Sequence, residues 1–87
     1  MGTRCGDIDP ALIPYLLRKL KLSIREIDDI LNKQSGLKGI SGISNDMRIL
    51  ENKSSGNKRA RLAIDIFVYR IRKYIGAYIA ATKNDNN

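Results

Sequence analysis

The sequence predicts a mainly α-helical fold that consists of a helical hairpin, a short helix and a long amphipathic helix. Apolar residues recur three and four positions apart along most of the chain, which is the period of one helix face. The sequence Ser23-Ile24-Arg25-Glu26 is a capping box, a pattern typical of a helix start. The 87 residues leave room for one small domain, and such a domain buries only about 60% of the surface that its unfolded form exposes.

The first helix of the hairpin is expected to start at Asp9-Pro10 and to end near Lys21. An aspartate can cap free backbone N–H groups, and a proline at the first helical position has no N–H to leave unpaired. Pro14 lies further along and should cost one hydrogen bond or bend the helix slightly. The apolar face of this helix consists of Leu12, Ile13, Leu16, Leu17 and Leu20.

The second helix should run from the capping box to Ser35-Gly36, where a glycine ends it. Between Gly36 and Ser44, glycines alternate with apolar residues, and this stretch is expected to be neither a helix nor a long strand. So many small residues indicate a backbone that passes close to a ligand or to another element. Ser44 is then expected to cap a short helix that begins around residues 45–48.

The last element is predicted to be a long helix from about Lys58 to Ala81. A polar surface turn over residues 52–57 precedes it, and a polar tail over 82–87 is expected to be disordered. One apolar face of the helix is formed by Ala60, Ile64, Phe67, Ile71, Tyr74, Ile75 and Tyr78. Residues 1–87 are therefore expected to form a single small domain.

The charge balance invites a comparison with nucleic-acid-binding proteins, since 16 Lys and Arg against 9 Asp and Glu give a net charge of +7. We favour a solvated helix side instead, where cations cover apolar surface with their stems. No known nucleic-acid motif accompanies the charge, and the aromatic residues Phe67, Tyr74 and Tyr78 fall on the apolar face of the last helix and not among the cations. The cations in question are Lys58, Arg59, Arg61, Arg70, Arg72, Lys73 and Lys83.

Composition excludes several classes of site. The chain has no histidine to serve as a base or a metal ligand, and its single cysteine, Cys5, cannot form an internal disulfide or a multi-cysteine zinc site. The opening ten residues lack the apolar run of a signal peptide, and no stretch reaches the roughly 20 apolar residues of a membrane span. We expect a cytoplasmic protein that binds neither a membrane nor nucleic acid.

Two segments contain candidate functional residues. Arg4 lies between Gly2 and Gly6, where a planar guanidinium could bind a phosphate with two hydrogen bonds, although an ordinary loop is the more common meaning of such a composition. The carboxylate of Asp46 could accept hydrogen bonds from ribose hydroxyls, and Arg48 could stack on a base. By spacing alone, a helix cap with an exposed arginine is the better explanation of the second segment.

Taken in order, four segments resemble the acetate kinase family, which belongs to the sugar kinase, Hsp70 and actin fold. They are Met1–Pro10, Asn32–Gly36, Gly39–Arg48 and Phe67–Tyr78. The resemblance extends to about Ala81. It implies that these helices come from the C-terminal domain of an α/β actin-like kinase, in which they pack on a sheet that this chain mostly lacks.

The resemblance also implies roles for individual residues. Family enzymes transfer the γ-phosphoryl group of ATP to acetate with Mg²⁺, and some relatives use propionate. Arg4 matches the arginine that stabilises the transferring phosphoryl group, whereas Asp46, Met47 and Arg48 match the segment that contacts the adenosine part of ATP. No residue here matches a metal ligand, and neither ATP nor Mg²⁺ is expected to bind tightly to this chain alone.

Other family motifs, among them a catalytic aspartate and a histidine-containing phosphate loop, have no counterpart in these residues. We therefore expect a fragment of an acetate kinase, arising from a reading frame within a broken gene or from excision, without activity of its own. Two alternatives stay open. The chain could be a helical interaction module that forms a homo-oligomer or binds an intact kinase chain, or it could be a small basic nucleic-acid binder.

Overall fold

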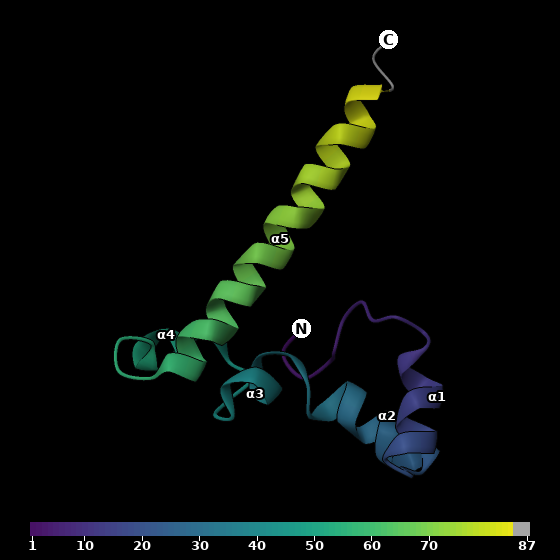
Figure 1. The fold of residues 1–87 in the computed structure, drawn as a ribbon. Helices are drawn as coiled ribbons and strands as arrows, with labels where there is room; N and C mark the ends of the chain where they lie inside the picture. Colours follow the sequence, from purple (N-terminus) through teal and green to yellow (C-terminus); the bar gives the residue numbers. More distant parts are fainter. Residues whose placement is uncertain (85–87) are drawn as a thin grey trace.

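The computed structural model describes residues 1–84 and contains five helices and no strand over that range. A hairpin of α1 (Leu12–Lys19) and α2 (Ile24–Lys33) is followed by the short helices α3 (Gly36–Ser41) and α4 (Met47–Lys53). Both short helices pack on the first turns of α5 (Lys58–Asn84), which projects far beyond them (Figure 1). The mainly helical class predicted from the sequence is confirmed, with one helix more than expected.

Helix α1 begins two residues later than predicted. Asp9 does accept a hydrogen bond, from the backbone N–H of Ala11 at 2.9 Å, but Pro10 and Ala11 form a turn that leads into the helix. The shift places Pro14 in the first turn, where N–H groups have no intrahelical acceptor. The expected loss of a hydrogen bond at Pro14 is therefore wrong. The helix also ends two residues earlier than predicted, because Lys21 adopts a positive φ of 54° in the link to α2.

The capping box of α2 is confirmed. The Ser23 hydroxyl accepts from the N–H of Glu26 at 3.1 Å, and the Glu26 carboxylate accepts from the N–H of Ser23 at 3.0 Å. These two bonds satisfy donors that the start of a helix leaves free. The helix ends at Lys33, next to the predicted stop.

Helix α3 corrects the expectation that residues 36–44 form no helix. Glycine disfavours a helix by about 1 kcal/mol relative to alanine, but here packing overrides that preference. Leu37 is buried against Leu50 of α4 and against Ala60 and Ala63 of α5. Gly42, with a φ of +72°, then ends the helix in the left-handed conformation.

The start of α3 lies directly against the N-terminal segment. The N–H groups of Leu37 and Lys38 donate to the carbonyls of Met1 (2.8 Å) and Gly2 (2.9 Å), so the segment caps the helix. Gly36 has a φ of +64°, and a Cβ at this position would collide with the carbonyl oxygen of Met1. The predicted close approach of backbone to another element is thus found here.

Helix α4 is capped by Asp46, which corrects the expectation that Ser44 caps it. Asp46 Oδ1 accepts from the N–H of Arg48 at 2.9 Å, whereas the Ser44 hydroxyl accepts from the N–H of Asp46 one step earlier. The helix continues to Lys53, so the turn before α5 is shorter than expected. Asn57 in that turn accepts from the N–H of Ala60 at 3.0 Å and caps α5.

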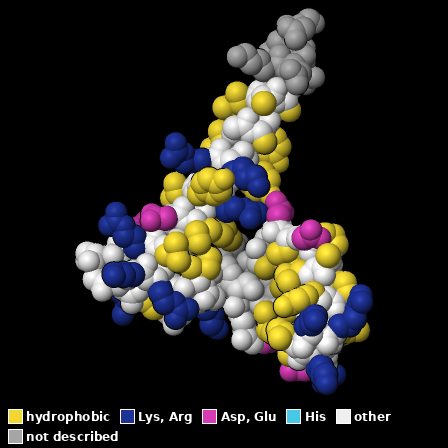
Figure 2. All heavy atoms as spheres, in the orientation of Figure 1, with side chains coloured by type: hydrophobic (Ala, Val, Ile, Leu, Met, Phe, Trp, Pro, Cys, Tyr) yellow, Lys and Arg dark blue, Asp and Glu magenta, His cyan; other side chains and the backbone are white. Residues whose placement is uncertain are grey.

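Only the beginning of α5 is covered by other elements. Ala60 and Ala63 are fully buried, but every residue from Ile71 to Thr82 is exposed. A disordered tail was expected from Thr82; α5 continues through Asn84, and residues 85–87 lie outside those described. Hydrophobic side chains gather along this uncovered part of the helix (Figure 2).

Candidate functional site

The N-terminal segment holds the backbone of Arg4 from both sides. Before Arg4, the hydroxyl of Thr3 donates to the carbonyl of Asn32 at 2.8 Å. After Arg4, the N–H of Cys5 donates to the carbonyl of Leu31 at 2.8 Å. Both acceptors lie in the last turn of α2, whose final carbonyls have no partner within the helix. The backbone at Arg4 is thus attached to the rigid end of a helix.

The side chain of Arg4 is exposed, in contrast to its anchored backbone. Within residues 1–84 its guanidinium makes no hydrogen bond or ion pair. Its five N–H donors are therefore available to an anion such as a phosphate group.

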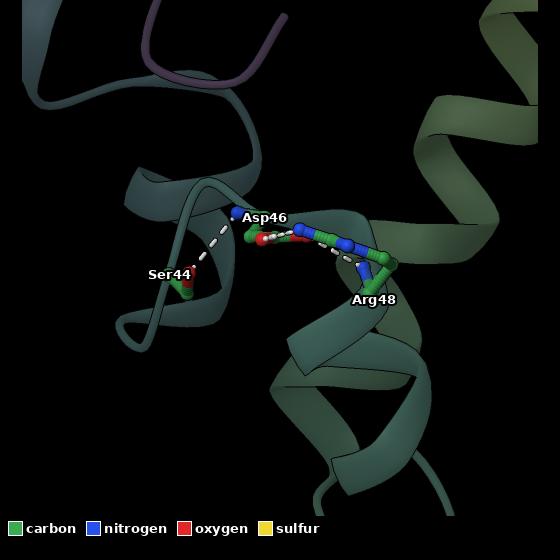
Figure 3. A network of polar contacts seen from close by, with 3 residues as sticks. All are labelled: Ser44, Asp46 and Arg48. Carbon is green, nitrogen blue, oxygen red and sulfur yellow. Dashed lines mark hydrogen bonds and ion pairs between the residues drawn. The ribbon is translucent and has the colours of Figure 1, made fainter.

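Asp46 and Arg48 form the second polar group, at the start of α4 (Figure 3). Asp46 Oδ2 accepts from Arg48 Nη2 at 3.2 Å, and Asp46 Oδ1 accepts from Arg48 Nε at 3.4 Å. The side chain of Asp46 is 34% exposed and that of Arg48 is 88% exposed. A carboxylate has about four lone-pair sites, so Asp46 keeps acceptor capacity toward solvent, and the planar face of Arg48 is open.

The ion pair also shifts the protonation of both groups. The hydrogen bond from the Arg48 side chain, followed by that from the Arg48 backbone N–H, holds the pKa of Asp46 below its ordinary value of 3.8. The same partner raises the pKa of Arg48. At neutral pH Asp46 is therefore an anion that can accept, but not donate, hydrogen bonds.

Met47 differs from its two neighbours, because its side chain is partly buried and packs against the core cluster of α3, α4 and α5. The contact fixes the first residue of α4 and thereby the direction in which Asp46 and Arg48 project. Of the three residues predicted in this segment, two face solvent and one holds the segment on the core.

The two candidate segments lie close together at Gly2 and Asn45. A Cβ at Gly2 would lie 3.3 Å from the Cβ of Asn45 and 3.4 Å from its carbonyl oxygen. Helix α3 connects the segments a second time, since its start is capped by the N-terminal segment and its end leads into Asn45. The structure thus brings Arg4 and the Asp46–Arg48 pair onto one small scaffold.

A model of the acetokinase family matches residues 1–86. The chain belongs to the acetokinase family. It is 62% identical over 81 residues to the acetate kinase of Halothermothrix orenii, a match that covers 92% of this chain and 20% of that protein. The acetate kinase of Methanosarcina thermophila is 54% identical over the same length, with the same coverage.

Solved structures agree with the family assignment. The acetate kinase of Porphyromonas gingivalis superposes with a TM-score of 0.85 at 46% identity, covering 93% of this chain and 21% of that one. A propionate kinase of Francisella tularensis reaches a TM-score of 0.84 at 46% identity, with coverages of 91% and 21%. This acetokinase-family chain therefore spans about one fifth of the length of its relatives.

Not all cations of α5 lie on a solvated side of the helix, and this corrects the interpretation of the charge given by the sequence. Arg59 donates from Nε to the carbonyl of Ile40 (3.0 Å), and Arg70 forms an ion pair with Asp7 at 3.3 Å. Arg70 also lies over the ring of Tyr74, at 5.8 Å from its centroid. Two of the seven cations considered earlier thus attach other segments to the helix, Arg59 the end of α3 and Arg70 the N-terminal segment.

Sequence reasoning missed the residues that anchor the N-terminal segment, above all Thr3, Ser35 and Gly36. Their partners are backbone atoms about 30 positions away, and a contact of that kind leaves no periodic pattern in a sequence. The only signal in the sequence was the density of glycines after Ser35. It indicated that the backbone passes close to a ligand or another element, but not which one.

Within the described residues, no three His, Cys, Asp or Glu side chains are arranged to hold a metal ion. None of the helices described is long and apolar enough to cross a bilayer.

Proposed function

We propose that these residues form the part of an acetate kinase that stabilises the transferring phosphoryl group and contacts the adenosine of ATP. The intact enzyme would transfer the γ-phosphoryl group of ATP to acetate, with Mg²⁺ held by residues outside this chain, and it would work in the cytoplasm. The observation that carries this proposal is the family match over residues 1–86. The geometry at Arg4 and Asp46 supports it.

Arg4 has the chemistry that phosphoryl transfer requires. Catalysis of this reaction depends on positioning and on neutralising the charge that spreads over the phosphoryl oxygens. A guanidinium with unengaged donors on an anchored backbone can do both. We assign to Arg4 the stabilisation of the transition state.

Asp46 and Arg48 suit the nucleoside. The ionised carboxylate can accept hydrogen bonds from ribose hydroxyls while its other sites hold Arg48, and the exposed guanidinium plane can stack on a base. Met47 keeps this segment on the core. The contact between Gly2 and Asn45 would then set the distance between the nucleoside and phosphoryl ends of one ATP molecule.

The acceptor substrate is a small carboxylate. The relatives named above include acetate kinases and a propionate kinase of nearly equal structural similarity. We propose acetate because the two relatives named above at 62% and 54% identity are acetate kinases. Propionate is the alternative, which a direct comparison of the two substrates would test.

The chain alone should be inactive, because four fifths of the relatives' length lies outside the match. We expect the 87-residue chain, mixed with ATP, acetate and Mg²⁺, to form no acetyl phosphate above the blank. A signal that disappears in Arg4→Ala would contradict this expectation.

A chimera tests the residues themselves. Residues 1–82 of this chain would replace the matching segment of the Halothermothrix orenii acetate kinase. We expect the chimera to make acetyl phosphate, and we expect Arg4→Ala in it to lower kcat by about 10²- to 10³-fold, the usual effect of losing a transition-state donor. A chimera that folds but is inactive, or an Arg4→Ala variant with full activity, would refute the proposal.

The uncovered face of α5 favours a second candidate function, binding to an intact kinase chain. A groove of about 380 Å³ opens between the N-terminal segment and α5. It is lined mostly by apolar side chains, among them Phe67, Ile71, Tyr74, Ile75 and Tyr78. The match covers only 20% of the Halothermothrix orenii acetate kinase. We infer that residues from the remaining four fifths of such a protein cover this face. Co-purification with an intact acetate kinase, lost on Ile75→Lys, is the expected result; no co-purification would exclude this function.

A further inference from the structure

We infer that Thr3 is a positioning residue for Arg4, acting through the last turn of α2. This inference rests on the proposed function, because it assumes that Arg4 meets the phosphoryl group. It adds a residue outside those assigned above. The structural basis is the way in which two chain segments, 29 residues apart, satisfy each other's backbone groups.

Near the end of α2, the carbonyl of Ile30 still accepts from a helical donor, the Gln34 N–H at 3.3 Å, and also from the Ser35 hydroxyl at 2.6 Å. The carbonyls that follow need partners from outside the helix. The next two carbonyls, of Leu31 and Asn32, accept from Cys5 N–H and from the Thr3 hydroxyl, both at 2.8 Å. The residues on either side of Arg4 thus complete the end of this helix.

Thr3 is attached on a second side as well. Its carbonyl accepts from the N–H of Ser35 at 2.9 Å, which lies in the short link between α2 and α3. Thr3 therefore contacts α2 through its side chain and the link through its backbone. Of these anchors, the hydroxyl is the one that a substitution can remove without changing the main chain.

The contrast between backbone and side chain at Arg4 makes this anchor important. The Arg4 side chain is exposed and makes no hydrogen bond or ion pair within residues 1–84. Among the described residues, the direction of the guanidinium therefore depends on the backbone to which it is attached. A misplacement of about 1 Å in a positioned group can cost about 100-fold in rate, so loss of the Thr3 anchor should reduce kcat.

The chain offers a matched control for this substitution. Thr82 also donates its hydroxyl to a backbone carbonyl, that of Tyr78, at 2.8 Å, but it lies far along α5. Thr3→Val and Thr82→Val each remove one hydroxyl of the same kind with little change in shape. Thr3→Ser keeps the hydroxyl and should restore function.

The first measurement uses the 87-residue chain and hydrogen exchange. Thr3→Val should speed exchange of the Cys5 amide by about 10-fold or more, because the neighbouring anchor is lost, while the capped amide of Glu26 in α2 stays protected. Thr3→Ser and Thr82→Val should leave Cys5 as in the parent chain. Unchanged exchange at Cys5 in Thr3→Val would overturn the inference.

The second measurement uses the kinase chimera described above. Thr3→Val should lower kcat by about 10- to 100-fold, with KM for ATP and for acetate changed by less than about twofold. Thr3→Ser should recover most of kcat, and Thr82→Val should show none of this effect. An active chimera in which Thr3→Val keeps the parent kcat overturns the positioning role alone. An inactive parent chimera overturns the proposed function and this inference with it.

Discussion

The guanidinium of Arg59 occupies the space beside Gly42 that a side chain would need. A Cβ at Gly42 would lie 2.9 Å from Nη1 of Arg59. From this position Arg59 donates to the carbonyls of Ile40 (3.0 Å) and Gly39 (3.3 Å), which belong to the last turn of α3. One side chain thus joins the end of α3 to the start of α5, and the glycine makes room for it.

Gly42→Ala should therefore destabilise the chain. The residue has a φ of +72°, a conformation that costs an ordinary L-residue about 1–2 kcal/mol, and the new methyl group would displace Arg59. Gly76→Ala is the matched control, since it lies within α5 with nothing within 4 Å of its Cβ position. That substitution should stabilise the helix by roughly 0.5–1 kcal/mol. Urea unfolding followed by circular dichroism would measure the stability of both variants. Equal changes in stability in the same direction would contradict the role assigned to Gly42.

Ser23→Ala should remove the capping box of α2. Loss of a serine cap costs about 1 kcal/mol of stability. The hydrogen bond from the Ser23 backbone N–H, followed by that from the Ser23 hydroxyl, lowers the pKa of Glu26, so part of this shift should also disappear. Ser55→Ala, in the exposed turn before α5, serves as the control and should have little effect on Tm. An unchanged pKa of Glu26 in Ser23→Ala, measured by NMR titration, would show that the box does not form in solution.

Stability should fall in acid through two specific carboxylates. The pKa values of Glu26 and Asp46 lie below their ordinary values of 4.5 and 3.8 in the folded chain. Folding therefore favours the ionised forms, and their contribution is complete above the ordinary values and is lost as the pH falls through the lowered ones. Thermal unfolding between neutral pH and about pH 3 would measure this slope. The double variant Glu26→Gln, Asp46→Asn should flatten it, and an unchanged slope in that variant would assign the acid sensitivity to other groups.

The apolar groove on α5 should drive self-association of the isolated chain, because large exposed apolar patches favour contacts between copies. Ile75 lies in the groove and is 52% exposed, whereas Leu62, at 51% exposed, lies outside it. Ile75→Lys should shift the chain toward monomer in sedimentation velocity. Leu62→Lys adds the same charge and should not. If both substitutions dissociate the chain equally, net charge and not the groove controls its association.

Local patterns in the sequence predicted the elements whose causes are local. The capping box of α2, the start of α5 at Lys58 and the helical class follow from spacing and from side chains that bond to nearby backbone. The errors arose where distant residues decide. Helix α3 forms despite its glycines because Leu37 finds a buried site among residues of α4 and α5.

The candidate site shows the same division. Arg4 and the Asp46–Arg48 pair were found through the resemblance of four ordered segments to a family, and the family match bears out that resemblance. Their roles remain predictions. The closeness of the two segments at Gly2 and Asn45 was not predictable from the sequence. Neither residue type indicates which distant residue it will lie beside.

By itself, the sequence determined the helical character of this chain, its family and the types of side chain available for phosphate and nucleoside. Only the tertiary structure decided which backbone groups hold Arg4, which cations serve the fold and which apolar face stays uncovered. The physical reason is the range of the interactions involved. Helix periodicity and caps act within about four residues, whereas the Thr3–Asn32 hydrogen bond and the core contact of Leu37 exist only after distant segments have packed together.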